Sequence, residues 1–343
     1  MVIRSKAPLR LGLAGGGTDV AQYSDIYGGN VLNVTINMFA YCTLEPLATD
    51  DIEFVALDIK NRFKTKTMFT PIQLGGGLDL HKAIYNRIVR DYNNGQPLAV
   101  RVTTHSDAPP GSGLGSSSTM VVAILSAYCE WLNLPLGEYD IARLAYDIER
   151  IDCNLAGGKQ DQYAATFGGF NFMEFGTNGS VIVNPLRIKP AIEAELEQRM
   201  ILFFTGKSRD SAKIIDDQIK DSSNQDSKSL NAMHQTKAMS LDMKNFILQG
   251  KLTDFVKMFA DMWEIKKQFA SSISNDHIDT VADAVLQNGA EAVKISGAGG
   301  GGFMMIFVDP LRRLDVMQIL AQFEGEAHKC QFYHNGVTTW RVQ

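Results

Sequence analysis

Glycines and hydroxyl residues spaced as in a phosphate-binding loop lie together in one short segment of the chain. The segment reads Pro109-Pro110-Gly111-Ser112-Gly113-Leu114-Gly115-Ser116-Ser117-Ser118-Thr119. Glycine lets the backbone approach a ligand closely and adopt positive φ angles. Serine and threonine favour a helix start, where free N–H groups and the helix dipole attract an anion. The pattern therefore predicts a phosphate-binding loop, and a capped turn without a ligand is the simpler alternative.

Two other glycine-rich segments accompany this loop. One is Ala14-Gly15-Gly16-Gly17-Thr18-Asp19, which ends in an acid, and the other is Gly297-Ala298-Gly299-Gly300-Gly301-Gly302. Three such segments cost the chain much entropy on folding. One anionic ligand held from several sides would explain all three. For the last segment, a glycine hairpin without a function is the alternative.

Residues suited to phosphoryl transfer lie near these segments. That reaction needs a metal site, neutralisation of charge and an oriented nucleophile. Ser117 and Ser118 offer hydroxyls for Mg²⁺ beside the loop, and Arg10 supplies a cation close to the first glycine segment. Glu149 and Asp161 are candidate acids, and each alone also fits an ordinary solvated helix face. Asp161 stands out because it belongs to a Gly-Gly-x-x-Asp element for which packing offers no reason.

Two common phosphate motifs are excluded. Gly206-Lys207-Ser208 follows a strand-like run, as the end of a P-loop does, but the first glycine that this motif requires falls at Ile201. The last glycine segment matches the dinucleotide-binding pattern, yet residues 303–308 predict a strand where that fold needs a helix. We therefore expect this segment to form a tight loop between two strands.

Alternation and helical periodicity predict the elements that position these residues. We expect strands at 2–13, where Pro8 breaks the run, and at 31–46, 52–57, 63–69, 98–104, 170–175, 181–183, 200–205, 293–296, 303–308, 327–333 and 336–342. We expect helices at 78–92, 120–132 and 138–152 and at 208–221, 229–249, 252–270, 275–288 and 311–323. A further helix is expected to begin after Gly158 and to end at Gly168-Gly169.

The order of these elements predicts an α+β protein of two domains. Strands and helices follow one another without a repeated βα period, which argues against a doubly wound sheet. The composition changes between Pro185 and Pro190. We therefore expect an N-terminal domain at 1–187 and a C-terminal domain at 188–343.

The bulk composition narrows the class of protein. The chain has 343 residues, of which 45% are hydrophobic and 21% charged, as in a soluble globular protein of about two domains. A net charge of -5 without a basic block argues against nucleic acid as a partner. Four distant cysteines without a CxxC pair fit a reduced, cytoplasmic setting. We expect no signal peptide and no membrane span, and the sequence leaves a homodimer open.

Taken together, the three glycine segments resemble the motifs of the GHMP kinase family, in the same order along nearly the whole chain. Ala7-Pro8-Leu9-Arg10 through Asp19 resembles the first motif, Pro109–Ser118 the second and most specific one, and Lys294–Phe303 the third. The resemblance implies a ribosomal-protein-S5-domain-2-like N-terminal domain and a ferredoxin-like C-terminal domain, with the active site in the cleft between them. It also implies ATP and Mg²⁺ as cofactors and a small-molecule acceptor.

The resemblance further implies a role for individual residues. Asp161 would be the catalytic base and Arg10 its cationic partner. Ser117 and Glu149 would hold Mg²⁺, although Ser116 or Ser118 could stand in for Ser117. The phosphates of ATP would lie on Pro110, Gly111, Ser112, Gly113, Leu114, Gly115, Ser116, Ser117 and Ser118. The acceptor would be bound by Gly16, Gly17, Thr18, Asp19, Lys159, Arg209, Gly299 and Gly300.

Within the family, several stretches are most similar to the kinases that phosphorylate the anomeric hydroxyl of D-glycero-D-manno-heptose 7-phosphate, for nucleotide-activated heptose synthesis. They are the first motif, Tyr27-Gly28-Gly29-x-Val31-Leu32-Asn33, Leu80-His81-Lys82-x-x-Tyr85-Asn86-Arg87 and Thr205-Gly206-x-Ser208-Arg209-x-Ser211. A Gly15-Gly16-Gly17 run replaces the Gly-Glu-His of galactokinases, which argues against galactose. The alternatives are L-fucose kinase, a homologue that binds nucleotide or sugar without catalysis, and a nucleotide-dependent decarboxylase.

An acceptor that carries a phosphate of its own needs a second anion site. Six basic residues are candidates, namely Lys82, Lys159, Lys207, Arg209, Lys266 and Lys267. The sequence favours Arg209 together with Lys159. Most of the others fit ordinary surface charge.

Overall fold

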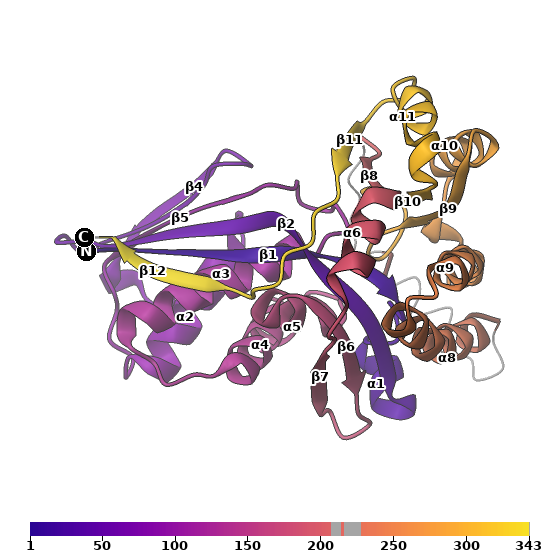
Figure 1. The fold of residues 1–343 in the computed structure, drawn as a ribbon. Helices are drawn as coiled ribbons and strands as arrows, with labels where there is room; N and C mark the ends of the chain where they lie inside the picture. The colour runs from indigo at the N-terminus through magenta and orange to yellow at the C-terminus, as the bar shows by residue number, and fades with distance from the viewer. Residues whose placement is uncertain (207–213, 216–227, 343) are drawn as a thin grey trace.

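Two β-sheets organise the computed structural model, which describes residues 1–206, 214–215 and 228–342. They form the two lobes of Figure 1, with both chain ends at the tip of the first lobe. The first sheet has the strand order β12-β1-β2-β5-β3-β4, with β6 and β7 branching from β2. These strands are β1 (Val2–Ala14), β2 (Gly29–Pro46), β3 (Asp51–Ala56), β4 (Asn61–Lys66), β5 (Val100–Ser106), β6 (Phe170–Phe175), β7 (Val181–Pro185) and β12 (Thr338–Val342).

The second sheet has the order β11-β8-β10-β9, with antiparallel neighbours. Its strands are β8 (Met200–Phe204), β9 (Ala290–Ile295), β10 (Phe303–Val308) and β11 (Glu326–Lys329). The central strand β10 is buried along its whole length. Phe303, Met305 and Phe307 pack in one core with helices α8 (Lys228–Gln249) and α9 (Leu252–Lys266). The alternate residues pack on the other face with α10 (Asp276–Gln287) and α11 (Arg313–Leu320), as the two-residue period of a strand requires.

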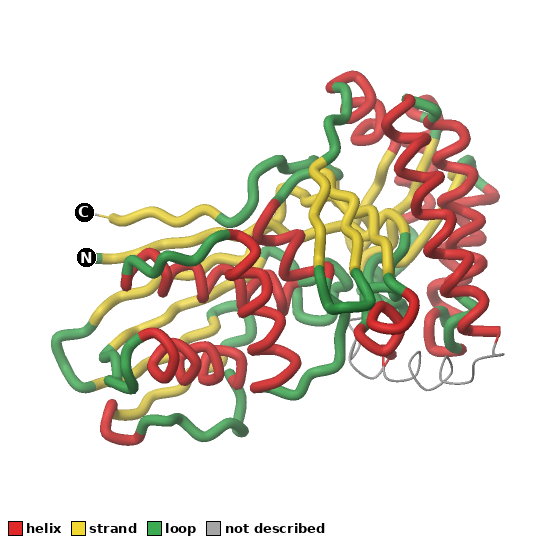
Figure 2. The backbone as a smooth tube through the Cα atoms, turned by 90° about the horizontal axis from the view of Figure 1, so that it is seen from below, coloured by secondary structure: helices red, strands yellow, loops and turns green. Residues whose placement is uncertain are grey.

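Helices of the first lobe cover one face of its sheet (Figure 2). They are α2 (Asp79–Tyr92), α3 (Ser116–Leu132), α4 (Glu138–Asp147) and α5 (Gln160–Phe167), while α1 (Ala21–Tyr27) and α6 (Pro190–Arg199) lie where the lobes meet. Helix α3 packs on β1 and β2, and its segment 121–125 is fully buried there. This packing fixes the start of α3, and with it the predicted phosphate loop, against the first sheet.

One hydrophobic core runs across the boundary between the lobes. Leu9 and Leu11 of β1 pack in the same cluster as Met243 of α8 and Phe255 and Phe259 of α9. The last strand, β12, also returns to the first lobe, where it pairs with β1. The predicted domain boundary at residue 187 therefore remains a proposal. Residues 338–342 belong to the first sheet, because they are hydrogen-bonded to β1.

Most predicted elements are confirmed, with shifts of a few residues at their ends. Pro8 does not break β1 but lies beside a register shift, where one residue separates Pro8 from Arg10 and residues 36–38 separate their β2 partners Thr35 and Phe39. The expected helix at 138–152 ends at Asp147 and continues as a π-helical turn, Ile148–Asp152. The predicted helix at 208–221 lies outside the described residues apart from 214–215, and the sequence patterns missed α1 and α6.

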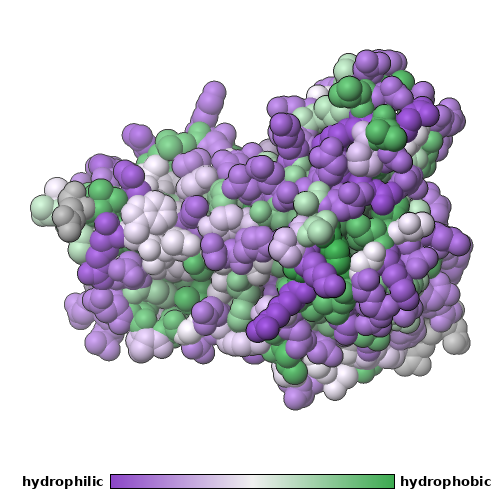
Figure 3. All heavy atoms as spheres, in the orientation of Figure 1, coloured by the Kyte–Doolittle hydropathy of each residue, from purple (hydrophilic) through white to green (hydrophobic). Residues whose placement is uncertain are grey.

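Hydrophilic side chains cover most of one face of the molecule (Figure 3). Smaller apolar patches lie among these side chains in Figure 3. In the ranges that the structure covers, no helix combines the length and apolar character needed to cross a membrane.

The phosphate loop and the last glycine segment, Gly297–Gly302, pack against each other, backbone to backbone. The N–H of Phe303 donates to the carbonyl of Ser112 at 2.9 Å. A Cβ atom at Gly302 would lie 2.3 Å from that same carbonyl oxygen, and one at Gly113 would lie 2.4 Å from the carbonyl oxygen of Ser296. Glycine is required here because any side chain would push the two lobes apart.

Replacing Gly302 by Ala should destabilise the protein, because the new methyl group meets a backbone oxygen at a φ of +89°. We expect the free energy of unfolding to fall by about 3 kcal/mol, measured by urea denaturation. The control is Gly179→Ala, at a φ of +77° with no neighbour within 4 Å, which should cost about 1 kcal/mol. Equal losses in the two variants would contradict the proposed packing role.

Candidate active site

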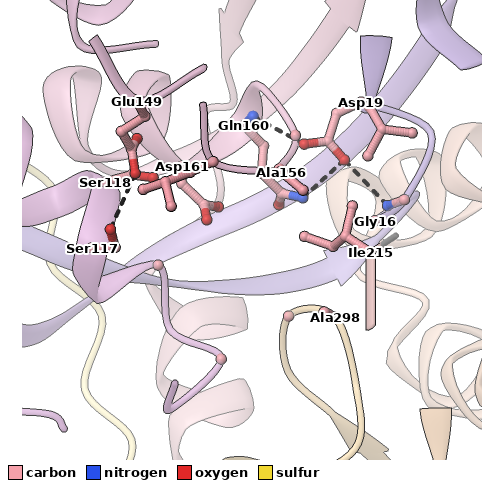
Figure 4. A pocket seen from close by; sticks show the side chains of 18 of the residues that line it. Gly16, Asp19, Ser117, Ser118, Glu149, Ala156, Gln160, Asp161, Ile215 and Ala298 are labelled. Atoms are coloured by element: carbon pink, nitrogen blue, oxygen red, sulfur yellow. Dashed lines mark hydrogen bonds between the residues drawn. The ribbon is translucent and has the colours of Figure 1, made fainter. Parts of the chain in front are cut away.

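A cavity of about 540 Å³ lies where the three glycine segments meet. Both lobes contribute to its wall. Its lining includes Arg10, Gly16, Gly17, Asp19, Pro110, Gly111, Gly113, Gly115, Ser116, Ser117, Ser118, Glu149, Arg150, Gly158, Gln160, Asp161, Lys266, Gly297 and Ala298. In Figure 4, Ser117 and Glu149 lie at one end, Asp19 and Gly16 at the other, and Asp161 between them.

The phosphate loop has the backbone geometry of an anion-binding nest. Gly111, Gly113 and Gly115 have φ angles of 74°, 79° and 76°, whereas Ser112 and Leu114 between them do not have positive φ. Alternating backbone conformations of this kind make concavities of N–H groups that bind anions. The carbonyls of the loop already have partners. The carbonyl of Ser112 accepts from the N–H of Phe303, that of Leu114 accepts from the N–H of Arg10, and that of Gly113 accepts from the Arg10 guanidinium and the Ser296 hydroxyl.

The serines occupy the first turn of α3 instead of capping it. The N-cap residue is Gly115, and no side chain makes a cap hydrogen bond. The first intrahelical N–H donor is that of Thr119, which reaches the carbonyl of Gly115 at 2.9 Å. The N–H groups of Ser116, Ser117 and Ser118 therefore precede the helical ladder and can donate to a ligand.

Arg10 and Asp161 form a close ion pair inside the cavity. Nε and Nη2 of Arg10 both lie 2.6 Å from Oδ1 of Asp161. Nη1 donates to the carbonyl of Gly113 at 2.7 Å, and the Arg10 side chain is 5% exposed. Because both contacts go to Oδ1, the other carboxylate oxygen of Asp161 is the one left to accept a proton or a hydrogen bond from a ligand.

Ser117, Glu149 and Gln162 form an oxygen-rich corner of the site. Oγ of Ser117 donates to Oε1 of Glu149 at 3.1 Å, and Glu149 is 1% exposed. Gln162 donates from Nε2 to Oε2 of Glu149 and to Oγ of Ser118, so it fixes the carboxylate in place. Glu149 lies on the π-helical turn, a type of irregularity found often at functional sites.

This corner has ligands of the type that Mg²⁺ prefers. In the part of the chain that the structure describes, no group of three or more His, Cys, Asp and Glu residues could hold a metal by itself. Magnesium usually takes only one or two carboxylates and completes its shell with phosphate oxygens and water. A buried carboxylate beside a hydroxyl, at the edge of a phosphate loop, fits that pattern.

Asp19 is held rigidly at the other end of the cavity. Its carboxylate accepts from the backbone N–H of Gly17 and Gln160 and from Nε2 of Gln160, at 3.0–3.2 Å. A Cβ at Gly158 would lie 1.9 Å from Oδ2 of Asp19, and one at Gly157 would lie 2.2 Å from the Arg150 guanidinium. The expectation that packing gives no reason for this glycine pair is therefore wrong.

Several predicted residues lie outside the cavity wall. Thr18 is buried and bonds to the carbonyls of Gly15 and Asn30. Nζ of Lys159 lies 2.6 Å from Asp25 and 3.0 Å from Ser24. Ser112, Leu114, Gly299 and Gly300 are not among the lining residues. The N–H of Gly300 donates to the carbonyl of Ile273 at 2.7 Å, and Arg209 lies outside the described residues.

Sequence patterns missed some residues that the structure brings to the site. Gln160 and Gln162 orient Asp19 and Glu149, and a glutamine beside a predicted catalytic acid carries no distinctive signal. Lys266, one of the six basic candidates but not one that the sequence favoured, lines the cavity from the end of α9, and its ammonium donates to the carbonyl of Gly297. Burial, with the nearby charge of Arg10, lowers the pKa of Lys266 to about 8.

A mostly apolar cavity of about 250 Å³, which no sequence pattern predicted, adjoins the phosphate loop. It shares Pro110, Ser116 and Ser117 with the main cavity. Other lining residues are Ala56, Asp58, Ile59, Leu78, Leu80, His81, Thr104, Ala108 and Met120. Burial lowers the pKa of His81 to about 4, so its imidazole is neutral near pH 7 and contacts Oγ1 of Thr104 at 2.9 Å.

The chain matches two families of known protein domains. The family described as GHMP kinases N terminal domain matches residues 79–169, and the family described as GHMP kinases C terminal matches residues 243–323. The first range contains the phosphate loop, Glu149 and Asp161, and the second contains Lys266 and the last glycine segment.

Comparison with individual proteins extends this match to the whole chain. D-glycero-alpha-D-manno-heptose 7-phosphate kinase of Campylobacter jejuni is 46% identical over 99% of both chains. The solved structure of a D-glycero-D-manno-heptose 1-phosphate kinase from Bacteroides thetaiotaomicron is 44% identical over 99% of both chains, with a TM-score of 0.85. L-fucokinase/L-fucose-1-P guanylyltransferase of Bacteroides fragilis is 25% identical, and the match covers 94% of this chain and 36% of that protein. The chain belongs to the GHMP kinase family, and it has the two-domain fold of that family.

Proposed function

We propose that this protein is an ATP- and Mg²⁺-dependent kinase that phosphorylates the anomeric hydroxyl of D-glycero-D-manno-heptose 7-phosphate, giving the 1,7-bisphosphate. The observation that carries the proposal is the Arg10–Asp161 ion pair between the phosphate loop and Asp19. This arrangement puts a proton acceptor between a site for the phosphoryl donor and a site for a polyol.

The phosphates of ATP are proposed to lie on the nest of Gly111, Gly113 and Gly115 and on the free N–H groups at the start of α3. The nucleobase of ATP is proposed to fill the adjoining apolar cavity, because that cavity shares Ser116 and Ser117 with the phosphate site. Ser117 and Glu149 would hold Mg²⁺, which neutralises charge on the phosphates when bound.

Asp161 is proposed to accept the proton of the acceptor hydroxyl. Arg10 holds the carboxylate through Oδ1, so the orientation of the free oxygen is set before the acceptor binds. Asp19 accepts hydrogen bonds from the ring hydroxyls at the far end of the cavity, and Gln160 keeps its carboxylate in position. Asp161 then accepts the proton of a hydroxyl whose position the enzyme has already fixed.

The choice of acceptor rests on the relatives that share more than 40% of their residues with this chain. Both are named for a D-glycero-D-manno-heptose phosphate, with the phosphate at position 7 in one name and at position 1 in the other. Phosphorylation of the 7-phosphate at position 1, or of the 1-phosphate at position 7, gives the same 1,7-bisphosphate, and we take the 7-phosphate as the acceptor because the first name states it for the relative of 46% identity. L-fucose is the alternative acceptor, supported by a relative of 25% identity.

Replacing Asp161 by Asn should lower kcat by on the order of a hundredfold or more, because the proton acceptor is lost. The KM for ATP should change little, since the nest and the serines remain. Asp147→Asn, which removes an acid that pairs with Arg143 at the surface, is the control. Initial rates of ADP formation measure both variants, and near-normal turnover of Asp161→Asn would rule out the base assignment.

Replacing Glu149 by Gln should raise the Mg²⁺ concentration needed for half-maximal activity by about tenfold or more, because a neutral amide is a poorer ligand for Mg²⁺. A Mg²⁺ titration at saturating ATP and acceptor measures this shift. Glu138→Gln, at the exposed start of α4, is the matched control. An unchanged Mg²⁺ dependence would place the metal elsewhere.

A panel of acceptors with ATP should identify the substrate. We expect D-glycero-D-manno-heptose 7-phosphate to give the highest kcat/KM, and ³¹P NMR of the product to show a new phosphate on the anomeric carbon. L-fucose, free heptose and galactose are the comparison acceptors. A higher kcat/KM with L-fucose, or a phosphate on another carbon, would overturn the proposed reaction.

A further inference from the structure

Among the residues that the structure describes, three cationic side chains line the cavity, and two of them already have partners that explain their presence. Arg10 pairs with Asp161. Arg150 donates to the carbonyls of Leu155, Ala156 and Gly158 and so holds the loop before α5. The third cation is Lys266, whose ammonium donates to the carbonyl of Gly297. Among residues 1–206, 214–215 and 228–342, no carboxylate lies within ion-pair distance of Lys266.

The surroundings of Lys266 disfavour a bare positive charge. The side chain is 4% exposed, and the cations Arg10 and Lys294 lie close enough to interact with it. Lys294 is bound to other groups, since its Nζ donates to the carbonyls of Gly12 and Leu13 at 2.8 Å. A buried ammonium without a carboxylate costs stability unless a ligand compensates for it. Such a residue beside an open cavity points to an anionic ligand.

Two observations connect Lys266 to the acceptor end of the site. Asp19 is the carboxylate whose charge acts on Lys266, and Ser117 and Glu149 lie at the end of the cavity opposite Asp19 (Figure 4). The loop with Gly297 and Ala298, to which the ammonium is bound, faces the cavity from the second lobe. An anion at Lys266 is therefore expected to belong to the acceptor, because the donor phosphates occupy the nest.

We propose that Lys266 binds the phosphate that the acceptor already carries and thereby selects a phosphorylated sugar over a free one. This inference rests on the proposed function, and it replaces the residues that the sequence favoured. Lys159 is neutralised by Asp25 and lies outside the cavity wall, so it offers no charge to the acceptor. Lys267, the next residue, points to Glu264 on its own helix.

A pH dependence follows from this placement. The charged groups around the ammonium are Arg10 on β1, Asp19 after it, Lys294 on β9, and Glu264 and Lys267 at the end of α9. With a pKa of about 8, Lys266 is charged below pH 8 in the free enzyme, and a bound phosphate dianion raises that pKa. Above pH 8 binding must first protonate the amine, so affinity for the phosphorylated acceptor falls, by up to about tenfold per pH unit.

The test compares Lys266→Met and Lys267→Met with the wild type, using D-glycero-D-manno-heptose 7-phosphate and free heptose as acceptors. We expect Lys266→Met to lose about 10- to 100-fold in kcat/KM for the 7-phosphate, mainly through KM. It should change less than about threefold with free heptose, and Lys267→Met should match the wild type with both. The rise in KM for the 7-phosphate between pH 8 and 9 should disappear in Lys266→Met.

Each other outcome has a distinct meaning. Equal losses of kcat with both acceptors would assign Lys266 to the transferring phosphoryl group and overturn the inference. A wild type that prefers the 7-phosphate, with a Lys266→Met variant that keeps this preference, would also overturn it and leave the proposed function intact. A wild type inactive with both acceptors would contradict the proposed function itself.

The melting temperature of each variant shows whether a loss of activity comes from a loss of stability. Removing a buried ammonium leaves no uncompensated charge, so Lys266→Met should melt at the wild-type temperature or above it. A variant that melts well below the wild type and loses activity with both acceptors would indicate a structural role and contradict the inference.

Discussion

The site depends on the contacts of one residue, Arg10. Its backbone N–H donates to the carbonyl of Leu114, and its guanidinium binds the carbonyl of Gly113 and the carboxylate of Asp161. A single side chain thus joins β1, the phosphate loop and α5, which lie far apart in the sequence. The pairing of β1 with β2 changes register between Pro8 and Arg10, directly before this residue.

The site also depends on close backbone packing around the phosphate loop. The phosphate loop is fixed by its carbonyls, which bond to β1 and to the residues around the last glycine segment, and this leaves its N–H groups for a ligand. Gly113 and Gly302 are needed where the segments touch. The hydrophobic core that spans β1, α8 and α9 holds the two lobes in this arrangement. The same glycines therefore serve packing between lobes and ligand binding.

The sequence predicted the parts of the site that carry a local signal. Glycine segments, an acid after a glycine pair and a run of serines are visible in the chain, and the structure gathers Arg10, Asp19, Ser117, Glu149 and Asp161 around one cavity.

Features that depend on long-range pairing were not visible. The sequence does not reveal that Lys159 pairs with Asp25, or that Gly300 bonds to Ile273. It also does not show that β12 crosses back to the first sheet, or that Gln160 and Gln162 orient two acids. These contacts join residues whose types are common everywhere in proteins, so only the fold distinguishes them.

The central claim is that the anomeric oxygen of the acceptor attacks the γ-phosphorus of ATP. It is tested most directly with an acceptor carrying ¹⁸O in the anomeric hydroxyl and with ³¹P NMR of the product. We expect the new phosphate signal to show the isotope shift of an ¹⁸O atom bonded to phosphorus. A new phosphate without that shift would show that another oxygen is the nucleophile and would contradict the proposed reaction.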